Sequence, residues 1–561
     1  MATSPSITQL VLDYLLHEQA GQIAVVCLLL LGLIWILDNG PKSKLATGRW
    51  GGAREKAAAR FKAHQQMWHR VFNKVALYIV SPRYQGDKRP LYFPDLQRGL
   101  LTVGAPGVGK TESCISPLVR SSLEQGYPVI LLDGKYPTES SRHAAYARHL
   151  GYDVKVFAPG FPESEICNIL DFLKDGEDGE MAAQLAKVLD KNFRKSTRDS
   201  DPYFEEAGQQ LIQAALQLAK TTLFSDLLMV GSILILSDLG KRVEAASDMN
   251  PFIRMAFMSL RAVKESEKTV ASIAGTATNY FQRFINRRII NSFVGKTSFP
   301  LDMQGRQLLI LGLDKEKQEA LSPLIAVVLH LMVTRNVSQR RHEPLIVVLD
   351  ELPTIHVDVV KWLNWYRENG LVLILGIQNI AQLEQSYGKE AARSIVGACS
   401  TKVLFNPGEV SSAKLLSDLL GDQVILERQR SKTRGRRQRS TSISEQHRVR
   451  KLFEPSQFLR LPPGKCILLS PGHRSKGEIG IPLKVKITIP TTETRKSEVS
   501  VKRWPQLRRW LIQQRQHREI GPTDIEQRMA LAETLLPPIT SSPIETAAQL
   551  GQLGKDLENS F

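Results

Sequence analysis

The feature that most constrains this chain is an eight-residue segment, Gly104–Thr111, with the pattern G-x-x-x-x-G-K-T. The short apolar run Leu100–Val103 precedes it, and a helix-like stretch follows it. In that setting the glycines allow a loop whose backbone N–H groups point at phosphate oxygens, and the start of the helix adds the positive end of its dipole. The residues expected to line this phosphate loop are Gly104, Ala105, Pro106, Gly107, Val108, Gly109, Lys110 and Thr111.

The phosphate loop implies both a nucleotide and a metal ion. Lys110 is expected to reach the β- and γ-phosphates of ATP, and the hydroxyl of Thr111 is expected to bind Mg²⁺. Such a loop connects a strand to a helix, which is the repeating unit of α/β folds. The sequence therefore predicts a RecA-like P-loop NTPase domain of the α/β class with a mostly parallel central sheet.

A second apolar run ends in two acids. Leu345–Leu349 is uniformly apolar, as in a strand buried on both faces, and Asp350 and Glu351 follow it. We expect Asp350 to hold Mg²⁺ through water and Glu351 to orient the attacking water as a general base. A buried strand that ends in a solvated acidic turn is the alternative.

A third apolar run, Leu371–Ile377, ends at Gln378. A polar side chain at the tip of such a strand can donate a hydrogen bond to the γ-phosphate or to the attacking water. Gln378 is therefore a predicted sensor of the nucleotide, and a turn cap is the alternative for it.

The distance along the chain between Lys110 and Asp350 is larger than a few β–α units require. Helical periodicity marks the intervening region 176–299, as in Met181–Leu189, and few strand-like stretches interrupt it. We predict an all-α domain inserted into the NTPase domain, whose own parts are then residues 91–175 and 300–490.

The N-terminal region contains a segment suited to a membrane. Residues 21–38 are almost entirely apolar and just long enough to cross the hydrocarbon layer. Residues 39–90 carry many basic residues, which remain on the cytoplasmic side and interact with anionic lipid, so residues 1–20 are expected outside. A single-pass membrane protein with a cytoplasmic bulk follows, and a signal peptide is the alternative.

Composition supports a globular protein that is attracted to a polyanion. The chain of 561 residues has 74 Lys and Arg against 56 Asp and Glu, a formal charge of +18, which suits nucleic acid or anionic lipid without deciding between them. The five cysteines are far apart and form no C-x-x-C pair, which argues against a disulfide framework or a structural zinc site.

Two further segments have unusual compositions. Residues 427–451 form a predicted flexible basic loop that contacts DNA phosphates without reading bases, or else a solvated loop tip. Its cations are Arg428, Arg430, Lys432, Arg434, Arg436, Arg437 and Arg439. Residues 491–561 are expected to be a polar, partly disordered tail with short helices.

Several short motifs also occur in a recognisable order. They are Thr47–Trp50, Leu131–Lys135, Asn168–Asp171, Asp350–Pro353, Gly376–Leu383 and Arg448–Pro455. Together, over about residues 46 to 475, they resemble the type IV coupling proteins (TraG/TraD-like), membrane-anchored DNA-pumping ATPases of bacterial conjugation and type IV secretion. Gly134, Tyr136 and Pro137 depart from the family's D-P-K-G-E strand end, so the family's glutamate is missing there.

The resemblance implies a hexameric ring with ATP at each subunit junction and single-stranded DNA moving through the centre. It also implies a place in the bacterial inner membrane, a DNA–relaxase complex as substrate and the proteins of a type IV secretion channel as partners. In such rings a neighbouring subunit supplies an arginine to the site, and Arg367 lies where the family carries that residue. An exposed arginine at a helix end is the alternative for Arg367.

The motor is not the only function compatible with these features. A membrane-bound substrate receptor that binds ATP without productive translocation has the same motifs. A double-stranded DNA translocase of the FtsK/HerA kind is a third hypothesis, which the long helical insertion and the segment Gln378–Leu383 disfavour.

Overall fold

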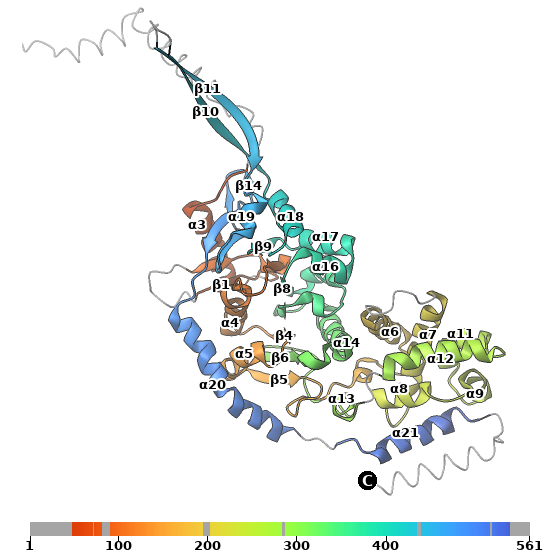
Figure 1. Cartoon of the computed structure of the whole chain (residues 1–561). Helices are drawn as coiled ribbons and strands as arrows, with labels where there is room; N and C mark the ends of the chain where they lie inside the picture. The colour runs from red at the N-terminus through yellow and green to blue at the C-terminus, as the bar shows by residue number, and fades with distance from the viewer. Residues whose placement is uncertain are drawn as a thin grey trace, which may run out of the picture. The chain divides into compact units, whose positions relative to one another are not determined.

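Figure 1 shows the computed structural model, which describes residues 48–70, 72–80, 90–193, 202–282, 286–434, 439–515 and 519–538. The expected membrane segment 21–38 and residues 1–20 lie outside the described residues. The chain divides into two compact units. One unit consists of Ser417–Phe453 with the chain up to Arg49, and the other consists of Trp50–Leu416 with the chain from Glu454 onward.

The second unit is built on a nine-stranded sheet. In sheet order its strands are β15 (Leu483–Lys486), β12 (Lys465–Leu469), β9 (Thr401–Leu404), β3 (Leu100–Val103), β8 (Leu371–Ile377), β7 (Leu345–Leu349), β4 (Val129–Asp133), β6 (Gln307–Gly312) and β5 (Asp153–Phe157). All neighbouring pairs from β9 to β5 are parallel, whereas β12 pairs antiparallel with both β9 and β15. The predicted α/β class with a mostly parallel sheet is confirmed.

The central strands are apolar because helices cover both faces of the sheet. Every residue of β4, β7 and β8 is buried. Alternate residues such as Leu131 and Val348 pack in one core cluster with Leu118 of helix α4 (Ser116–Glu124) and Ala144 of helix α5 (Thr138–His149). The uniform apolar runs that predicted strands in the sequence thus reflect burial on two sides.

Helix α14 (Gln318–Val337) also contains a long stretch of buried apolar residues. Among the described residues, α14 together with the three residues before it (Lys315–Val337) is the one stretch long and apolar enough to cross a membrane, and its most apolar part has a mean hydropathy of 1.5. Of the most apolar part of that segment, 78% is buried inside the protein. Its composition is accounted for by packing within the fold, where it contacts β6.

The described elements between β5 and β6 are helices. They are the short 3₁₀ helix Ile169–Phe172, α6 (Gly179–Phe193), α7 (Pro202–Lys220), α8 (Leu227–Leu234), α9 (Leu239–Ala245), α10 (Pro251–Ala256), α11 (Met258–Ala262), α12 (Glu267–Gln282) and α13 (Arg287–Ile290). The motif Asn168–Asp171 lies where the chain enters this helical insertion. The Asn168 side chain donates to the carbonyl oxygen of Ser225, and the Asp171 carboxylate accepts from the backbone and hydroxyl of Thr297. The motif therefore joins the entry to the exit of the insertion.

The basic segment in the first unit is a β-hairpin, and the expected flexible loop is wrong over its described part. Strands β10 (Asp422–Arg434) and β11 (Arg439–Lys451) pair antiparallel along their whole length, from Asp422 opposite Lys451 to Arg434 opposite Arg439. Lys451 closes the base through ion pairs of 3.0 Å with Asp418 and 3.2 Å with Asp422. A run of polar and basic residues concealed the strands, because sequence periodicity detects a strand by its apolar face.

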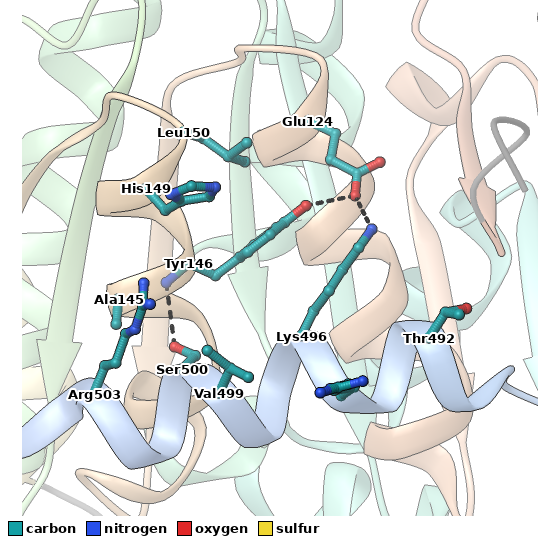
Figure 2. Close-up of a pocket in the computed structure, with 11 residues that line it drawn as sticks. Glu124, Ala145, Tyr146, His149, Leu150, Thr492, Lys496, Val499, Ser500 and Arg503 are labelled. Carbon is teal, nitrogen blue, oxygen red and sulfur yellow. Dashed lines mark hydrogen bonds and ion pairs between the residues drawn. The ribbon is translucent and has the colours of Figure 1, made fainter.

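The C-terminal region also differs from expectation. Helix α20 (Thr491–Gln514) runs along α5 as a single long helix. Figure 2 shows Lys496 of α20 and Tyr146 of α5 both pointing at Glu124 of α4, with Lys496 Nζ 2.6 Å and the Tyr146 hydroxyl 2.7 Å from Glu124 Oε1. Trp504 and Leu507 of α20 belong to the sheet's core cluster. The expected short helices of a polar tail are wrong for this segment.

A second C-terminal helix, α21 (Pro522–Leu535), packs on α8 of the helical insertion. The guanidinium of Arg528 bonds both carboxylate oxygens of Asp226, which is the N-cap of α8, and both side chains are nearly inaccessible. Arg242 donates to the carbonyl oxygen of Leu536. Helix α20 therefore binds to α5 beside the sheet, and α21 binds to the helical insertion.

The other α-helices and strands of the described residues complete the fold. They are α3 (Ala53–His69), β1 (Leu77–Ile79), β2 (Leu91–Phe93), α15 (Val359–Trp365), α16 (Ile380–Tyr387), α17 (Lys389–Ala398), α18 (Val410–Leu420), α19 (Pro455–Leu459), β13 (Arg474–Ser475) and β14 (Glu478–Ile479).

Candidate nucleotide site

The phosphate loop lies at the carboxyl edge of the sheet, directly after β3. Gly104 N donates to the carbonyl oxygen of Ile377 over 3.1 Å, and Ala105 N donates to that of Asn406 over 2.8 Å, so the loop is attached to the ends of β8 and β9. Gly107 has a φ of +79° and Gly109 a φ of +86°, a backbone conformation that favours glycine. Gly107 and Gly109 thus permit the turn from strand to helix.

Lys110 and Thr111 meet Asp350 at the head of the loop. The Thr111 hydroxyl donates to Asp350 Oδ2 over 2.8 Å, and Lys110 Nζ donates to the Asp350 carbonyl oxygen over 3.2 Å. Asp350 Oδ1 lies 3.5 Å from Lys110 Nζ but accepts no hydrogen bond, although it is buried. Residues separated by 239 positions in the sequence are therefore in direct contact.

This donor set fits Mg²⁺. Hydroxyl and carboxylate oxygens are ligands that Mg²⁺ prefers, and Asp350 Oδ1 is a buried oxygen that lacks a hydrogen-bond donor. The described residues contain no cluster of three His, Cys, Asp or Glu side chains that could hold a metal ion alone. The remaining ligands of an ion beside Thr111 would come from phosphate and water, as is usual for Mg²⁺.

Glu351 and Gln378 are hydrogen-bonded to each other. Gln378 Nε2 donates to Glu351 Oε1, and Lys135 Nζ lies 3.7 Å from Glu351 Oε2. Because β8 lies between β3 and β7, Gln378 emerges between the phosphate loop and the acidic pair. The helix cap is provided by Asn379, whose side chain accepts from Gln382 N at the start of α16. The alternative role of Gln378 as a turn cap thus belongs to its neighbour.

A further carboxylate near the site was not identified from the sequence. Glu139, in the first turn of α5, accepts a hydrogen bond from the Ser116 hydroxyl over 3.1 Å. Burial raises its pKa to about 7, against the opposing charge of Arg142 and with help from the negative charges of Asp350 and Asp133. In the family's D-P-K-G-E pattern the glutamate follows the aspartate by four residues, whereas Glu139 follows Asp133 by six, so the motif did not identify Glu139.

Asp133, at the end of β4, has a structural role. Its Oδ2 accepts hydrogen bonds from the backbone nitrogens of Glu139 and Ser140 and from the Ser140 hydroxyl, and its Oδ1 accepts from Lys135 N. These bonds fix the turn between β4 and the first turn of α5. Asp133 therefore positions the backbone that carries Lys135 and Glu139.

Arg367 lies away from this chain's own phosphate loop. It is exposed in a short 3₁₀ helix, Tyr366–Asn369, that precedes β8, whereas Gln378 follows the other end of that strand. At about 3.3 Å per residue, β8 separates the two ends by about 23 Å. Within one chain Arg367 does not reach the site.

The predicted DNA-contacting arginines fall in the first unit. Arg428, Arg430 and Arg434 belong to β10, and Arg439 begins β11. Arg436 and Arg437 lie outside the described residues.

Comparison with known families gives one extensive match. The family described as "Type IV secretion-system coupling protein DNA-binding domain" matches residues 88–481. This range includes the phosphate loop, the acidic pair, the helical insertion and the basic hairpin, and it ends before α20. Helices α20 and α21 therefore lie outside the matched region.

A curated relative is the coupling protein TraD of Escherichia coli strain K12. It is 24% identical over 236 residues, which is 40% of this chain. The match spans about a third, 32%, of TraD's own length.

Solved structures with a similar fold include three of the plasmid coupling protein TrwB. The unbound form of the bacterial conjugative coupling protein TrwBdeltaN70 has a TM-score of 0.53 at 15% identity, and the match covers 74% of this chain and 93% of the chain in that structure. The complex of TrwB with ADP and Mg²⁺ has a TM-score of 0.50 at 16% identity, and the match covers 74% of this chain and 93% of the other. The complex with the non-hydrolysable ATP analogue ADPNP has a TM-score of 0.50 at 15% identity, and the match covers 74% of this chain and 94% of the other. These likenesses establish a common fold.

Proposed function

This chain belongs to the type IV secretion-system coupling proteins, and we propose that it is an ATP-hydrolysing motor of the bacterial inner membrane. In this proposal it recruits a DNA–relaxase complex to a type IV secretion channel and drives single-stranded DNA through it as a hexameric ring. The observation that carries the proposal is the meeting of Thr111, Asp350, Glu351 and Gln378 at one edge of the sheet.

The proposed chemistry begins with binding of the triphosphate. The backbone of the phosphate loop and Lys110 bind the phosphate oxygens, while Thr111 and Asp350 hold Mg²⁺, which neutralises phosphate charge when it is bound. Solved complexes of TrwB with ADP and Mg²⁺ and with ADPNP support this assignment by fold. The hydrogen bond from Lys110 Nζ to the Asp350 carbonyl oxygen supports the role proposed for Lys110, because this ammonium group lies beside the loop and the acidic pair.

Glu351 then acts on the attacking water. Its carboxylate accepts the proton of that water as a general base, and Gln378 orients both the carboxylate and the water through its amide. The hydrogen bond between Gln378 and Glu351 supports this pairing, because two side chains in contact can bind the same water molecule.

Phosphate release by the full-length protein in nanodiscs tests the proposal, with and without single-stranded DNA. We expect DNA to stimulate release, Lys110→Ala to reduce it by about 10² or more, and Glu351→Gln to reduce it by about 10² to 10⁴ with nucleotide binding retained. Lys389→Ala, an exposed position at the start of α17, is the control and should behave as wild type.

The same assay separates the alternative functions. Nucleotide binding without DNA-stimulated release would favour the substrate receptor. Stimulation by double-stranded but not single-stranded DNA would favour the translocase of the FtsK/HerA kind. Either outcome overturns the motor proposed here.

A further inference from the structure

Helix α3 has a buried face that accounts for its attachment to the fold. Glu55, Ala59, Ala63 and Gln66 are buried, and the helix packs on β2 and β13. These small and polar side chains recur every three or four residues, as required for one face of a helix. Of the large apolar side chains of α3, Met67 is partly buried against a small core cluster, whereas Phe61 and Trp68 take no part in this packing.

The opposite face of α3 carries those large apolar side chains. Phe61 is 72% exposed and Trp68 is 80% exposed, and their spacing of seven residues places both on the face away from the core. Phe72, just beyond the helix, is 47% exposed. Single exposed apolar residues are ordinary, but three aromatic side chains within twelve residues indicate a surface that binds something. We call Phe61 and Trp68 the aromatic face of α3.

The charges around the aromatic face have one sign. Arg54, Lys56 and Arg60 are exposed on α3, and Lys74 is exposed after it. The one acid of the helix, Glu55, is buried, and its carboxylate accepts a hydrogen bond of 2.7 Å from Gly52 N. Arg54 lies seven residues before Phe61 and therefore on the same side of α3, which suits a partner with a negative surface and an apolar layer beneath it. Lys56 and Arg60 line a groove between α3 and β2.

The position of α3 in the chain limits its distance from the predicted membrane segment. The predicted membrane segment ends at residue 38, and Ala53 begins α3 fifteen residues later. At no more than about 3.6 Å per residue, that length of chain spans at most about 54 Å. In the proposed function the start of α3 therefore lies no more than about 54 Å along the chain from the bilayer.

We propose that the aromatic face of α3 lies in the headgroup region of the anionic cytoplasmic leaflet. This inference rests on the membrane location in the proposed function and adds a second, peripheral contact to it. Trp68 and Phe61 enter the interface, where aromatic rings with an apolar body are favoured. Arg54 binds lipid phosphate at the same depth. The contact orients the NTPase domain on the membrane through a helix that packs on it.

A depth measurement on the full-length protein tests the contact. Cys27→Ser leaves Cys114, Cys167, Cys399 and Cys466, which are all buried. In that background, Phe61→Cys or Trp68→Cys is labelled with the fluorophore NBD, and the protein is placed in nanodiscs of phosphatidylcholine with phosphatidylglycerol. The quencher is a nitroxide on the lipid headgroup. The matched control is Phe252→Cys in α10, where the native side chain is 65% exposed.

We expect headgroup quenching at positions 61 and 68 to exceed that at position 252 by at least threefold, and to fall when phosphatidylglycerol is omitted. Equal quenching at all three positions overturns the inference. Disulfide crosslinking between two unlabelled Trp68→Cys copies, with no quenching, also overturns it, because the face would then be covered by a second copy of the chain.

DNA-stimulated phosphate release measured on the same samples keeps the two proposals apart. Release without quenching contradicts the membrane contact alone. Quenching without release contradicts the motor alone.

Discussion

Gly376 shows how closely two strands approach at the nucleotide site. A Cβ atom at this position of β8 would lie 2.1 Å from the Asp350 carbonyl oxygen and 2.8 Å from Asp350 Oδ1. The Asp350 carbonyl group cannot move away at low energetic cost, because it belongs to the backbone and also accepts a hydrogen bond from Lys110. Glycine is therefore required here by the close approach of β8 to the acidic pair.

Gly376→Ala should displace Asp350 and lower DNA-stimulated phosphate release by about 10²-fold, since a shift of about 1 Å at a catalytic group is enough for such a loss. Gly397→Ala in α17 is the control, because a Cβ there meets nothing within 4 Å. That change should preserve activity and slightly raise the melting temperature. Wild-type release by Gly376→Ala would contradict the role assigned to Asp350.

His330 makes the stability of the fold sensitive to acid. It lies on α14 with its ring stacked on Trp362 at a centroid distance of 6.3 Å, and neither ring nitrogen has a hydrogen-bond partner in the described structure. Burial lowers its pKa to about 4, and the charge of Lys361 acts in the same direction. The unfolded chain, with an ordinary histidine pKa of about 6.5, therefore binds this proton first.

The free energy of unfolding should fall as the pH drops from about 6.5 toward about 4, because the unfolded state gains a proton at His330 in that window. At pH 5 this protonation lowers the free energy of unfolding by about 2 kcal/mol. His330→Phe keeps the aromatic contact with Trp362 but removes the titrating group. We expect the melting temperature of this variant to fall less than that of wild type between pH 7.5 and pH 5. Equal decreases in the two proteins would rule out the assignment.

At the scale of elements, a chain of contacts joins the nucleotide site to the helical insertion. The Tyr387 hydroxyl at the end of α16 donates to the Ile355 carbonyl oxygen over 2.9 Å, and the Tyr387 ring stacks on His356. His356 in turn exchanges two hydrogen bonds with the Asn192 side chain of α6, at 2.7 and 2.8 Å. Residues just after Glu351 are thus held by the helix that follows Gln378 and by the insertion.

The basic hairpin β10–β11 gives a prediction about DNA. If its arginines bind phosphates, replacing Arg428, Arg430, Arg434 and Arg439 by Gln should reduce the salt dependence of single-stranded DNA affinity by up to about 3 in log–log slope. Affinity titrations at several salt concentrations measure this slope. Replacing the same four residues by Lys is the matched control, because it keeps the charges. A slope unaffected by the Gln changes would place the DNA elsewhere.

At the scale of the whole molecule, the site is proposed to be completed by another copy of the chain. Arg367 is exposed and lies about 23 Å along β8 from its own Gln378. Arg367→Ala should leave nucleotide binding intact but lower ATP turnover by about 10³ or more, the usual contribution of an arginine supplied in trans. Turnover at the wild-type rate would refute the assignment.

Mixing two inactive variants provides the control for this idea. In a mixture of Lys110→Ala and Arg367→Ala subunits, some junctions combine an intact phosphate loop with an intact neighbouring arginine. Phosphate release should therefore reappear in the mixture. An arginine that acts within its own chain predicts no recovery.

Most of the nucleotide site could be predicted because each part has a local signature. The glycines of the loop, the apolar run before Asp350 and the apolar run before Gln378 each report a short-range backbone preference or burial on two faces. Glu139 had no such signature, since its nearness to the site depends on the turn that Asp133 fixes. The hairpin β10–β11 and the helix α20 were not predicted for a similar reason, because polar runs carry little periodic apolar signal.

The sequence by itself determined the local conformations: a glycine loop that turns from strand to helix, buried strands that end in acids, and helices in the insertion. Only the tertiary structure decided which of these segments meet. The order β3–β8–β7 brings Thr111 against Asp350 and Gln378 against Glu351, while α20 binds α5 and α21 binds α8 of the insertion. Local patterns encode backbone preference and burial over a few residues, whereas contacts across 239 positions depend on strand order and packing summed over the whole core.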